Sequence, residues 1–187
     1  MKQPKLKTEK LILRPFEMSD APRVKLLAGD KEIADTTLNI PHPYEDGMAE
    51  QWISTHKEKF EKGELVNFSI ILKETDTLIG AIGLVINKRF NRAELGYWIA
   101  KDFWNQGYGT EAAERILEYG FMERKINKIF ASHLTRNPSS GRIMKKIGMK
   151  KEGEFREHVI KWDKYENIIF YGITQKEWQE LRKADSL

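Results

Sequence analysis

The sequence predicts an α/β protein built on a mixed β-sheet, and three features lead to that prediction. Three segments with the alternating pattern of strands follow one another over residues 66–99, separated by polar turns that favour antiparallel pairing. An amphipathic helix over 109–124 then leads to a strand at 128–134, which is typical of a crossover in a mixed sheet. The chain has 187 residues, enough for one domain with a substantial core and too few for two ordinary ones.

The first half of the chain places two helices between its strands. In the second of these helices Met48, Trp52 and Ile53 form an apolar stripe, and Gly63 ends it. The segment that follows alternates apolar and polar residues, as a strand with one buried face does. The elements expected in this half are a strand at 8–16, helices at 19–28 and within 40–63, and strands at 66–72, 77–86 and 93–99.

The second half begins with the most regular helix, because its apolar residues recur at helical spacing from Ala112 to Gly120. The elements expected after it are a strand at 128–134, a helix at 138–148 closed by a glycine, strands at 150–161 and 165–173, and a C-terminal helix at about 175–184. The order is therefore β-α-α-β-β-β-α-β-α-β-β-α. We expect a single domain over residues 1–187, with a core of about 6–174.

Composition excludes several kinds of chemistry. The chain has no cysteine, which removes disulfides, cysteine-ligated zinc and a cysteine acyl-enzyme. The histidines at 42, 56, 133 and 158 lack metal-binding spacing, so we expect no metal. No apolar run has the length of a signal peptide or a membrane span, so we expect a cytoplasmic protein without a membrane partner.

The net charge of +4 is small for a nucleic-acid-binding protein, and no direct nucleic-acid partner is expected. The basic residues are nevertheless clustered near the predicted helix at 138–148. This cluster comprises Arg142, Lys145, Lys146, Lys150 and Lys151. It is either a solvated helix face or a landing site for a phosphorylated ligand.

The segment FWNQGYGTEA (103–112) places two glycines at the mouth of a helix, where glycine weakens the first turn. A P-loop is excluded, because the Gly-Lys-Ser/Thr sequence is absent. Gly107, Gly109 and Ala112 match a dinucleotide fingerprint, but no strand runs straight into the first glycine and the next strand ends without an acidic residue. Two readings remain: a tight turn into a helix, or a loop whose backbone amides hold the diphosphate of coenzyme A.

Several segments together resemble a known family, the GNAT superfamily of N-acetyltransferases, and within it the Rim-type branch that acetylates the N-termini of ribosomal proteins. The resemblance runs from about residue 6 to 174. It rests on TEKLILRPF, LIGAIGL, AELGYWI, WNQGYGTEA and NPSSGRIMKKIGM, which occur in that order on matching predicted elements.

The resemblance implies a GNAT fold and a binding site for acetyl-CoA. The loop from Trp104 to Thr110 would bind the pyrophosphate, through Gln106, Gly107, Tyr108, Gly109 and Thr110. The strand at 93–99 would diverge from the strand at 128–134, and the pantetheine arm would pair with backbone near Trp98 and Ile99 in the gap. Asn137 would bind the same arm. Trp104 stands where the superfamily often has Arg or Gln, so the loop amides must contribute more of the phosphate binding.

The same resemblance indicates two catalytic candidates. Glu94 lies on the strand that the family places beside the thioester, and partial burial would raise its pKa, as a general base requires. Many relatives use a tyrosine as the acid at the position of Met144, which has no proton to donate. We therefore assign the role of acid for the leaving thiolate to Ser140. The local alternatives are a solvated strand residue for Glu94 and cap or turn residues for Ser140 and Asn137. His133 is either a second base or a packed side chain.

We expect an acetyl-CoA-dependent N-acetyltransferase that moves the acetyl group directly to a primary amine. The preferred acceptor is the N-terminal α-amine of a ribosomal protein. The loop at 38–46 would form one lip of the acceptor cleft, with Tyr44 as a wall and Glu45 and Asp46 at the entrance. One alternative acceptor is a small cationic amine, a polyamine or an aminoglycoside. A second alternative is a non-catalytic module that senses coenzyme A or docks on the ribosome. The sequence does not predict the oligomeric state.

Overall fold

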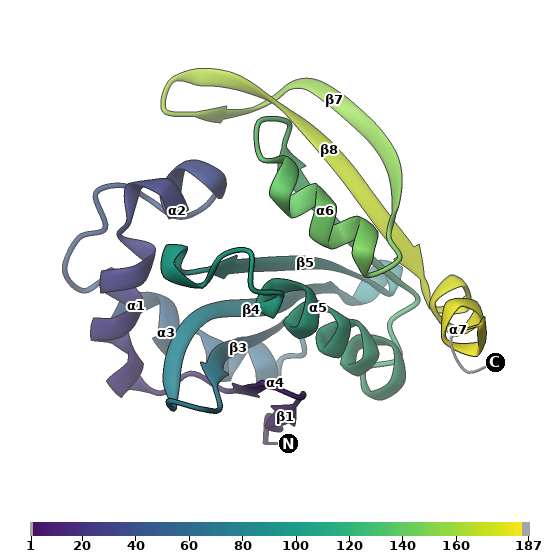
Figure 1. Ribbon diagram of the computed structural model, residues 1–187, viewed down its shortest axis with the longest axis horizontal. Coiled ribbons are helices and arrows are strands. Elements are labelled where there is room, and N and C mark those ends of the chain that lie inside the picture. Colours follow the sequence, from purple (N-terminus) through teal and green to yellow (C-terminus); the bar gives the residue numbers. More distant parts are fainter. Residues whose placement is uncertain (1, 185–187) are drawn as a thin grey trace.

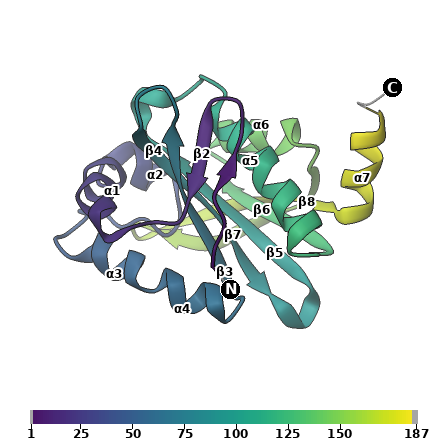
Figure 2. The ribbon, with the colours of Figure 1, turned by 90° about the horizontal axis from the view of Figure 1, so that it is seen from below.

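In a computed structural model, which describes residues 2–184, the chain forms one eight-stranded sheet with helices on both faces (Figures 1 and 2). The strand order is β1-β2-β3-β4-β5-β6-β8-β7. Neighbouring strands are antiparallel except β5 and β6, which are parallel and joined by helix α5. The mixed sheet, the antiparallel meander and the crossover predicted from the sequence are all confirmed.

The strands are β1 (Leu6–Lys7), β2 (Leu11–Arg14), β3 (Leu65–Leu72), β4 (Thr77–Asn87), β5 (Arg92–Ile99), β6 (Lys128–Leu134), β7 (Lys150–Lys161) and β8 (Lys164–Thr174). The helices are α1 (Ala21–Ala28), α2 (Lys31–Thr36), α3 (Met48–Ser54), α4 (His56–Glu61), α5 (Tyr108–Glu118), α6 (Pro138–Lys146) and α7 (Gln175–Ala184). A π-helical turn, Tyr119–Glu123, extends α5.

The structure differs from the predicted elements in three places, all in the first half. The strand expected at 8–16 is a short β1–β2 hairpin, because the chain turns back at Thr8 to Lys10. The helix expected within 40–63 is divided at Thr55 into α3 and α4. Helix α2 was not predicted: it has six residues, begins at the Asp30 cap and buries only Ile33 and Ala34.

The helices divide between the two faces of the sheet, as Figure 2 shows from below. Helices α5 and α6 cover one face, which we call the front, and the larger apolar cluster lies beneath them around Ile82, Leu95 and Ile116. Helices α1, α3 and α4 lie on the back. A smaller cluster lies there around Val24, Ile53 and Leu78.

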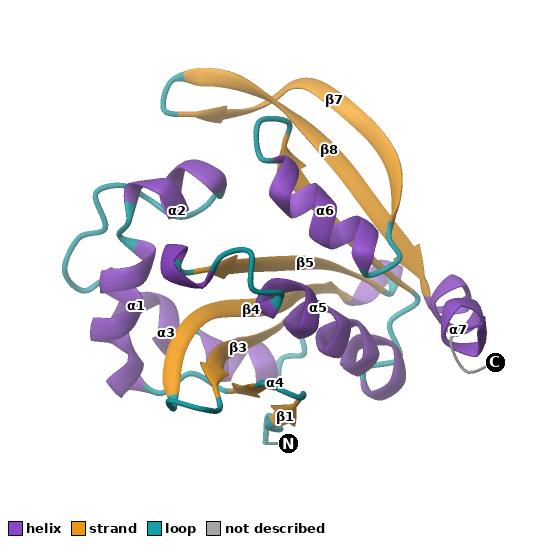
Figure 3. Ribbon diagram, viewed as in Figure 1, coloured by secondary structure: helices purple, strands orange, loops and turns teal. Residues whose placement is uncertain are grey.

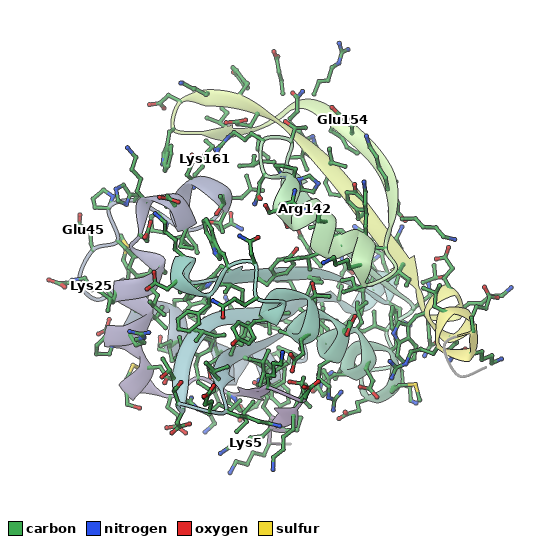
Figure 4. The ribbon with its side chains drawn as sticks, viewed as in Figure 1. Lys5, Lys25, Glu45, Arg142, Glu154 and Lys161 are labelled. Carbon is green, nitrogen blue, oxygen red and sulfur yellow. The ribbon has the colours of Figure 1, made fainter. Side chains whose placement is uncertain are left out.

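The β7–β8 hairpin arches over α6 and extends toward α2 (Figures 1 and 3). Its tip turns at Trp162 and Asp163, both with positive φ. Next to the tip, the buried ammonium of Lys161 donates to the carbonyls of Leu38 (3.4 Å) and Ile40 (3.1 Å), in the loop that follows α2. Figure 4 shows Lys161 between the hairpin and α2. The tip is thus fixed to a loop more than 100 residues away in the sequence.

Candidate active site

The sheet opens between β5 and β6. Their parallel pairing ends at Glu94 and Phe130. Beyond that point β5 stays paired with β4 as far as Ile99, while β6 stays paired with β8 as far as Leu134. The two strands therefore separate toward their carboxyl ends, and each presents an unpaired edge to a gap in the middle of the sheet.

Two hydrogen bonds show which backbone groups of β5 face this gap. The N–H of Asn127, just before β6, donates to the carbonyl of Asn91 at 3.0 Å, so Asn91 faces β6. The N–H of Ala100 donates to the carbonyl of Ile79 at 2.8 Å, so Ala100 faces β4. Since backbone groups alternate along a strand and β5 has no bulge, its odd-numbered residues face the gap and its even-numbered residues bond to β4.

This alternation changes the expected coenzyme contacts. The backbone of Trp98 bonds to β4, so its amide and carbonyl are not presented to the gap, and its side chain packs on the smaller apolar cluster. Tyr97 and Ile99 present their backbone groups to the gap instead. The carbonyl of Ile99 already accepts a hydrogen bond from the indole Nε1 of Trp104 (2.6 Å), a contact that the sequence did not reveal. The free backbone groups next to Ile99 at this edge are therefore those of Tyr97 rather than those of Trp98.

Gly107 leaves the backbone at the start of α5 open to solvent. It caps the helix with a φ of 87°, a conformation that favours glycine, and a Cβ atom built there would meet no atom within 4 Å. The N–H of Glu111 makes the first helical bond, to the carbonyl of Gly107, and no side chain caps this end. The amides of Tyr108, Gly109 and Thr110 therefore have no intrahelical partner. Such amides, at the positive end of the helix dipole, suit an anion.

Gly109 serves a different purpose from Gly107. A Cβ atom at Gly109 would lie 2.9 Å from Cδ1 of Ile143, on α6. This glycine therefore lets α5 and α6 approach closely on the front of the sheet. Gln106 is tied to the loop through its side-chain amide, which donates to the carbonyl of Asp102 at 2.9 Å. The two glycines of the motif are thus required for different reasons, Gly107 for its positive φ and Gly109 for the close packing of α5 and α6.

Ser140 lies on the first turns of α6, beside the gap. Its Oγ is 2.8 Å from the hydroxyl of Tyr97, which also donates to the backbone carbonyl of Ser140 at 3.1 Å. Burial raises the pKa of Tyr97 to about 12, against the opposing effect of the hydrogen bond with Ser140. Met144 is buried in the front cluster, and its thioether has no proton to donate. The contact with Tyr97 was not predicted from the sequence.

Both the oxygen and the nitrogen of the Asn137 side-chain amide make structural hydrogen bonds. Its Oδ1 accepts the N–H of Ser140 at 3.3 Å, which caps α6, and its Nδ2 donates to the carbonyl of Thr36 at 3.0 Å. These contacts agree with the local reading of Asn137 as a helix cap. A bond to a coenzyme would use the remaining lone pair or N–H of the amide.

Glu94 lies at the point where β5 and β6 separate, on the back of the sheet. It lines a cavity of about 580 Å³ together with Phe130, Arg92 and Glu64. The residue is solvent-accessible, but the cavity walls partly desolvate its carboxylate and raise its pKa, while Arg92 acts in the opposite direction. A raised pKa in a recess is a property that a general base requires.

The structure does not bring Glu94 and Ser140 together on one face. Glu94 alternates with Ala93 and Leu95, which are buried beneath the front helices, so its side chain lies on the back, whereas Ser140 lies in front. The gap between β5 and β6 begins at Glu94, and Tyr97 on its β5 edge contacts Ser140, so the gap adjoins both residues. Both side chains can act on one reacting centre only if that centre lies in the gap.

The loop at 38–46 is arranged differently from the expected acceptor lip. Tyr44 packs on the smaller apolar cluster, beside Gly29, so its ring is part of a core contact. Asp46 forms an ion pair with Lys25 of α1, which offsets its charge. Glu45 is exposed, on the same side of the molecule as Lys25 in Figure 4.

The basic cluster is partly neutralised. Lys150 pairs with Glu177 and Lys151 with Glu154, as a solvated surface does. Arg142, labelled on α6 in Figure 4, donates to the hydroxyl of Ser139 at 2.7 Å. These contacts favour the solvated reading for the two lysines of β7.

His133 is a packed side chain. It is 6% exposed, stacks on Tyr171, and has its Nδ1 2.8 Å from the carbonyl of Leu134. Nε2 has no hydrogen-bond partner and faces Gly141 of α6. The structure therefore favours the packed reading of this residue over a second base.

Comparison with known proteins decides the family. The Acetyltransferase (GNAT) domain matches residues 10–150 of the chain. The chain belongs to the GNAT family of acetyltransferases. It is 34% identical over 173 residues to YnaD, an uncharacterized N-acetyltransferase of Bacillus subtilis, in a match that covers 91% of this chain and 97% of that protein. A GNAT-family acetyltransferase from Bacillus anthracis has a similar structure, with a TM-score of 0.81, 28% identity and coverage of 92% and 99% of the two chains.

Two more distant GNAT structures show the shared fold alone. One is a ribosomal-protein-S5-alanine acetyltransferase from Vibrio fischeri, with a TM-score of 0.83, 18% identity and coverage of 94% and 99%. The other is a spermidine N-acetyltransferase from Vibrio cholerae in complex with CoA and spermine, with a TM-score of 0.79, 22% identity and coverage of 91% and 98%. They act on different amines, so the GNAT fold does not fix the acceptor.

Within residues 2–184, no group of three or more His, Asp or Glu side chains is placed to hold a metal ion. No helix in this described part of the chain is long and apolar enough to cross a membrane.

Proposed function

We propose that this GNAT enzyme transfers the acetyl group of acetyl-CoA to the N-terminal α-amine of a protein, with a ribosomal protein as the first candidate. The observation that supports transfer is the gap between β5 and β6, flanked by the open glycine loop on the front and by Glu94 on the back. The expected cytoplasmic location belongs to the same proposal.

The residues present fit coenzyme A. The amides of Tyr108, Gly109 and Thr110 would hold its diphosphate, and the empty space above Gly107 lets a phosphate approach bare backbone. The gap-facing backbone of Tyr97 and Ile99 would pair with the amides of the pantetheine arm, as an added strand pairs with a free edge. When bound, acetyl-CoA supplies a thioester, which is an activated acetyl donor with a thiolate leaving group.

Two side chains would act on the reacting centre from opposite faces. From the back, the carboxylate of Glu94 would accept a proton from the amine, directly or through a water molecule, because its raised pKa makes it a better base than an ordinary glutamate. From the front, the hydroxyl of Ser140 would donate a hydrogen bond to the sulfur as negative charge develops on it. Direct transfer by this arrangement needs no acyl-enzyme.

The α-amine is favoured as acceptor by its proton equilibrium. Its pKa is about 7.7–8.0, whereas that of lysine is about 10.4. At neutral pH the α-amine is therefore roughly 300-fold richer in the reactive neutral form, which corresponds to about 3.4 kcal/mol. The site offers one moderate base, Glu94, so an amine that is already partly neutral suits it better.

A small cationic amine is the second candidate. Glu94, Glu64 and Phe130 line the same cavity, and a cavity with two carboxylates and an aromatic ring suits a cation. Arg92 and Lys88 line the same cavity and reduce this attraction. The similarity to a spermidine acetyltransferase supports this alternative only at the level of the fold.

A competition experiment separates the two acceptors. The purified enzyme would receive acetyl-CoA and equal concentrations of a peptide beginning with Ser or Ala, spermidine and an aminoglycoside at neutral pH. Free thiol gives the total rate and mass spectrometry gives the acetylated product. We expect the peptide to have the highest specificity constant.

The outcomes test the identity of the acceptor separately from the presence of acetyltransferase activity. A higher specificity constant for either small amine would reject the N-terminal acceptor and leave acetyl transfer intact. Binding of acetyl-CoA without thiol release for any amine would favour a non-catalytic coenzyme-sensing or ribosome-docking module instead.

A further inference from the structure

The hydroxyl of Tyr97 lies within hydrogen-bonding distance of two oxygens of the same residue. It lies 2.8 Å from Oγ of Ser140 and 3.1 Å from the backbone carbonyl of Ser140. Tyr97 lies on β5 and Ser140 on α6, so the contact spans the front opening of the gap. The tyrosine side chain is partly buried against the front cluster, so water competes less for its hydrogen bonds than at an exposed site.

A phenol has one proton, so Tyr97 can donate to only one of the two acceptors at a time. When it donates to the carbonyl, it can accept the proton of the Ser140 hydroxyl, which then points away from any other acceptor. When it donates to Oγ, the Ser140 proton must point elsewhere. The direction of the serine proton therefore depends on the rotation of the Tyr97 hydroxyl.

We propose that Tyr97 is a positioning residue that turns the proton of Ser140 toward the leaving sulfur. This inference rests on the proposed function and deepens it. As the carbon–sulfur bond breaks and its electron pair stays on sulfur, the Tyr97 hydroxyl rotates from the carbonyl to Oγ. The Ser140 hydroxyl then donates its hydrogen bond to the sulfur. Neither residue forms or breaks a covalent bond, and the thiolate takes its final proton from water.

The chemistry of the two hydroxyls supports this arrangement. Burial keeps the pKa of Tyr97 near 12, so the phenol remains protonated and remains a donor at neutral pH. A serine that accepts a hydrogen bond on its oxygen becomes a stronger donor through its own proton. A hydrogen bond to a charged acceptor is also stronger than one to a neutral acceptor. The rotation of the Tyr97 hydroxyl to Oγ therefore becomes more favourable as negative charge develops on the sulfur.

A merely structural role is the alternative, since the same contact ties α6 to β5 across the gap. A double-mutant cycle of Tyr97→Phe and Ser140→Ala separates the two roles. We expect Tyr97→Phe to lower kcat roughly tenfold with little change in KM for acetyl-CoA. The double variant should be no slower than Ser140→Ala alone, because Tyr97 acts only through Ser140. Tyr119→Phe removes another shielded phenol, beyond the end of α5 and away from the gap, and should keep the wild-type kcat.

A binding measurement gives a readout independent of turnover. Calorimetry would compare coenzyme A with desulfo-coenzyme A, which lacks the sulfur, from pH 6 to 10. In the wild type the ratio of the affinity for coenzyme A to the affinity for desulfo-coenzyme A should rise with pH, as the thiol ionises. This gain should be reduced in both Tyr97→Phe and Ser140→Ala.

Two results would overturn the inference while leaving acetyl transfer in place. One is additive losses of kcat in the double variant, and the other is a rise in KM for acetyl-CoA at unchanged kcat in Tyr97→Phe. An inactive wild-type enzyme would instead reject the proposed function, and the inference with it.

Discussion

At the scale of single residues, the ionised form of Glu94 that a general base needs is the form that the folded protein disfavours. Burial raises its pKa, so the folded protein favours the protonated form. Its contribution to stability is therefore present at low pH and is lost as the pH rises through the folded-state pKa. At neutral pH the cavity walls partly desolvate the charged carboxylate, although the residue as a whole is exposed. A residue that a fold holds in this way is a candidate for catalysis rather than for stability.

Glu94→Gln should separate these two effects. The amide cannot accept the proton of the amine, so kcat should fall on the order of 10²–10⁴-fold. The melting temperature at neutral pH should stay the same or rise slightly, because an unfavourable charge is removed. Steady-state kinetics and thermal unfolding of the same preparation check both. Full turnover in the variant, with chemistry limiting the rate, would show that Glu94 is not the base.

At the scale of elements, the two glycines at the start of α5 should respond differently to substitution. Gly107→Ala adds a Cβ in open space at a positive φ, so it should cost about 1 kcal/mol and weaken coenzyme binding. Gly109→Ala pushes on the flexible end of Ile143, so it should act mainly on stability. Calorimetric titration with coenzyme A and urea unfolding measure the two effects. Equal losses of affinity in both variants would contradict this division.

Lys161 joins the β7–β8 hairpin to the loop after α2, which the sequence predicts to line the acceptor cleft, so we expect the loss of this contact to affect the acceptor. Lys161→Met removes the donors to the carbonyls of Leu38 and Ile40 at similar side-chain volume. KM for the acceptor peptide should rise about threefold to tenfold, as for a lost hydrogen bond, while KM for acetyl-CoA stays constant. Lys164, which is exposed and pairs with Lys161 across the hairpin, gives the matched control Lys164→Met. A similar effect in both variants would show that charge, rather than the contact, matters.

Elements with strong local patterns were predicted well, and those that depend on distant partners were not. The bounds of β6 and β7 match the predicted 128–134 and 150–161. Helix α2 was missed because its six residues are mostly polar, and its stability comes from the Asp30 cap and from the burial of Ile33 and Ala34.

The candidate site was predicted in part for the same reason. The glycine loop and the gap follow from local motifs and from the resemblance. The contact between Tyr97 and Ser140 joins residues 43 apart in the sequence, and the separation of Glu94 from Ser140 by the sheet follows from register. No local spacing encodes either fact.

At the scale of the whole molecule, His56 links stability to pH. Burial against Phe16 and Trp52 lowers its pKa to about 4, with a smaller contribution from Lys59. The neutral form is favoured by folding, so this stability is fully present above pH 6.5 and is lost as the pH falls toward 4. The loss should be about 3 kcal/mol.

Urea unfolding between pH 7 and 4 tests this prediction, with His56→Gln as the comparison. The variant keeps an acceptor for the side-chain amide of Asn67 but does not titrate in this range. Its stability should fall less with pH than that of the wild type. Parallel pH profiles for the two proteins would show that other groups control acid unfolding.

The central claim is that coenzyme A lies in the gap between β5 and β6 with its diphosphate on the mouth of α5. Amide hydrogen exchange by NMR, with and without coenzyme A, tests it most directly. The amides of Tyr97 and Ile99 and those of Tyr108 to Thr110 should become protected, whereas that of Trp98, already bonded to β4, should change little. Binding of coenzyme A without protection at these alternate positions of β5 and at the helix mouth would contradict the account.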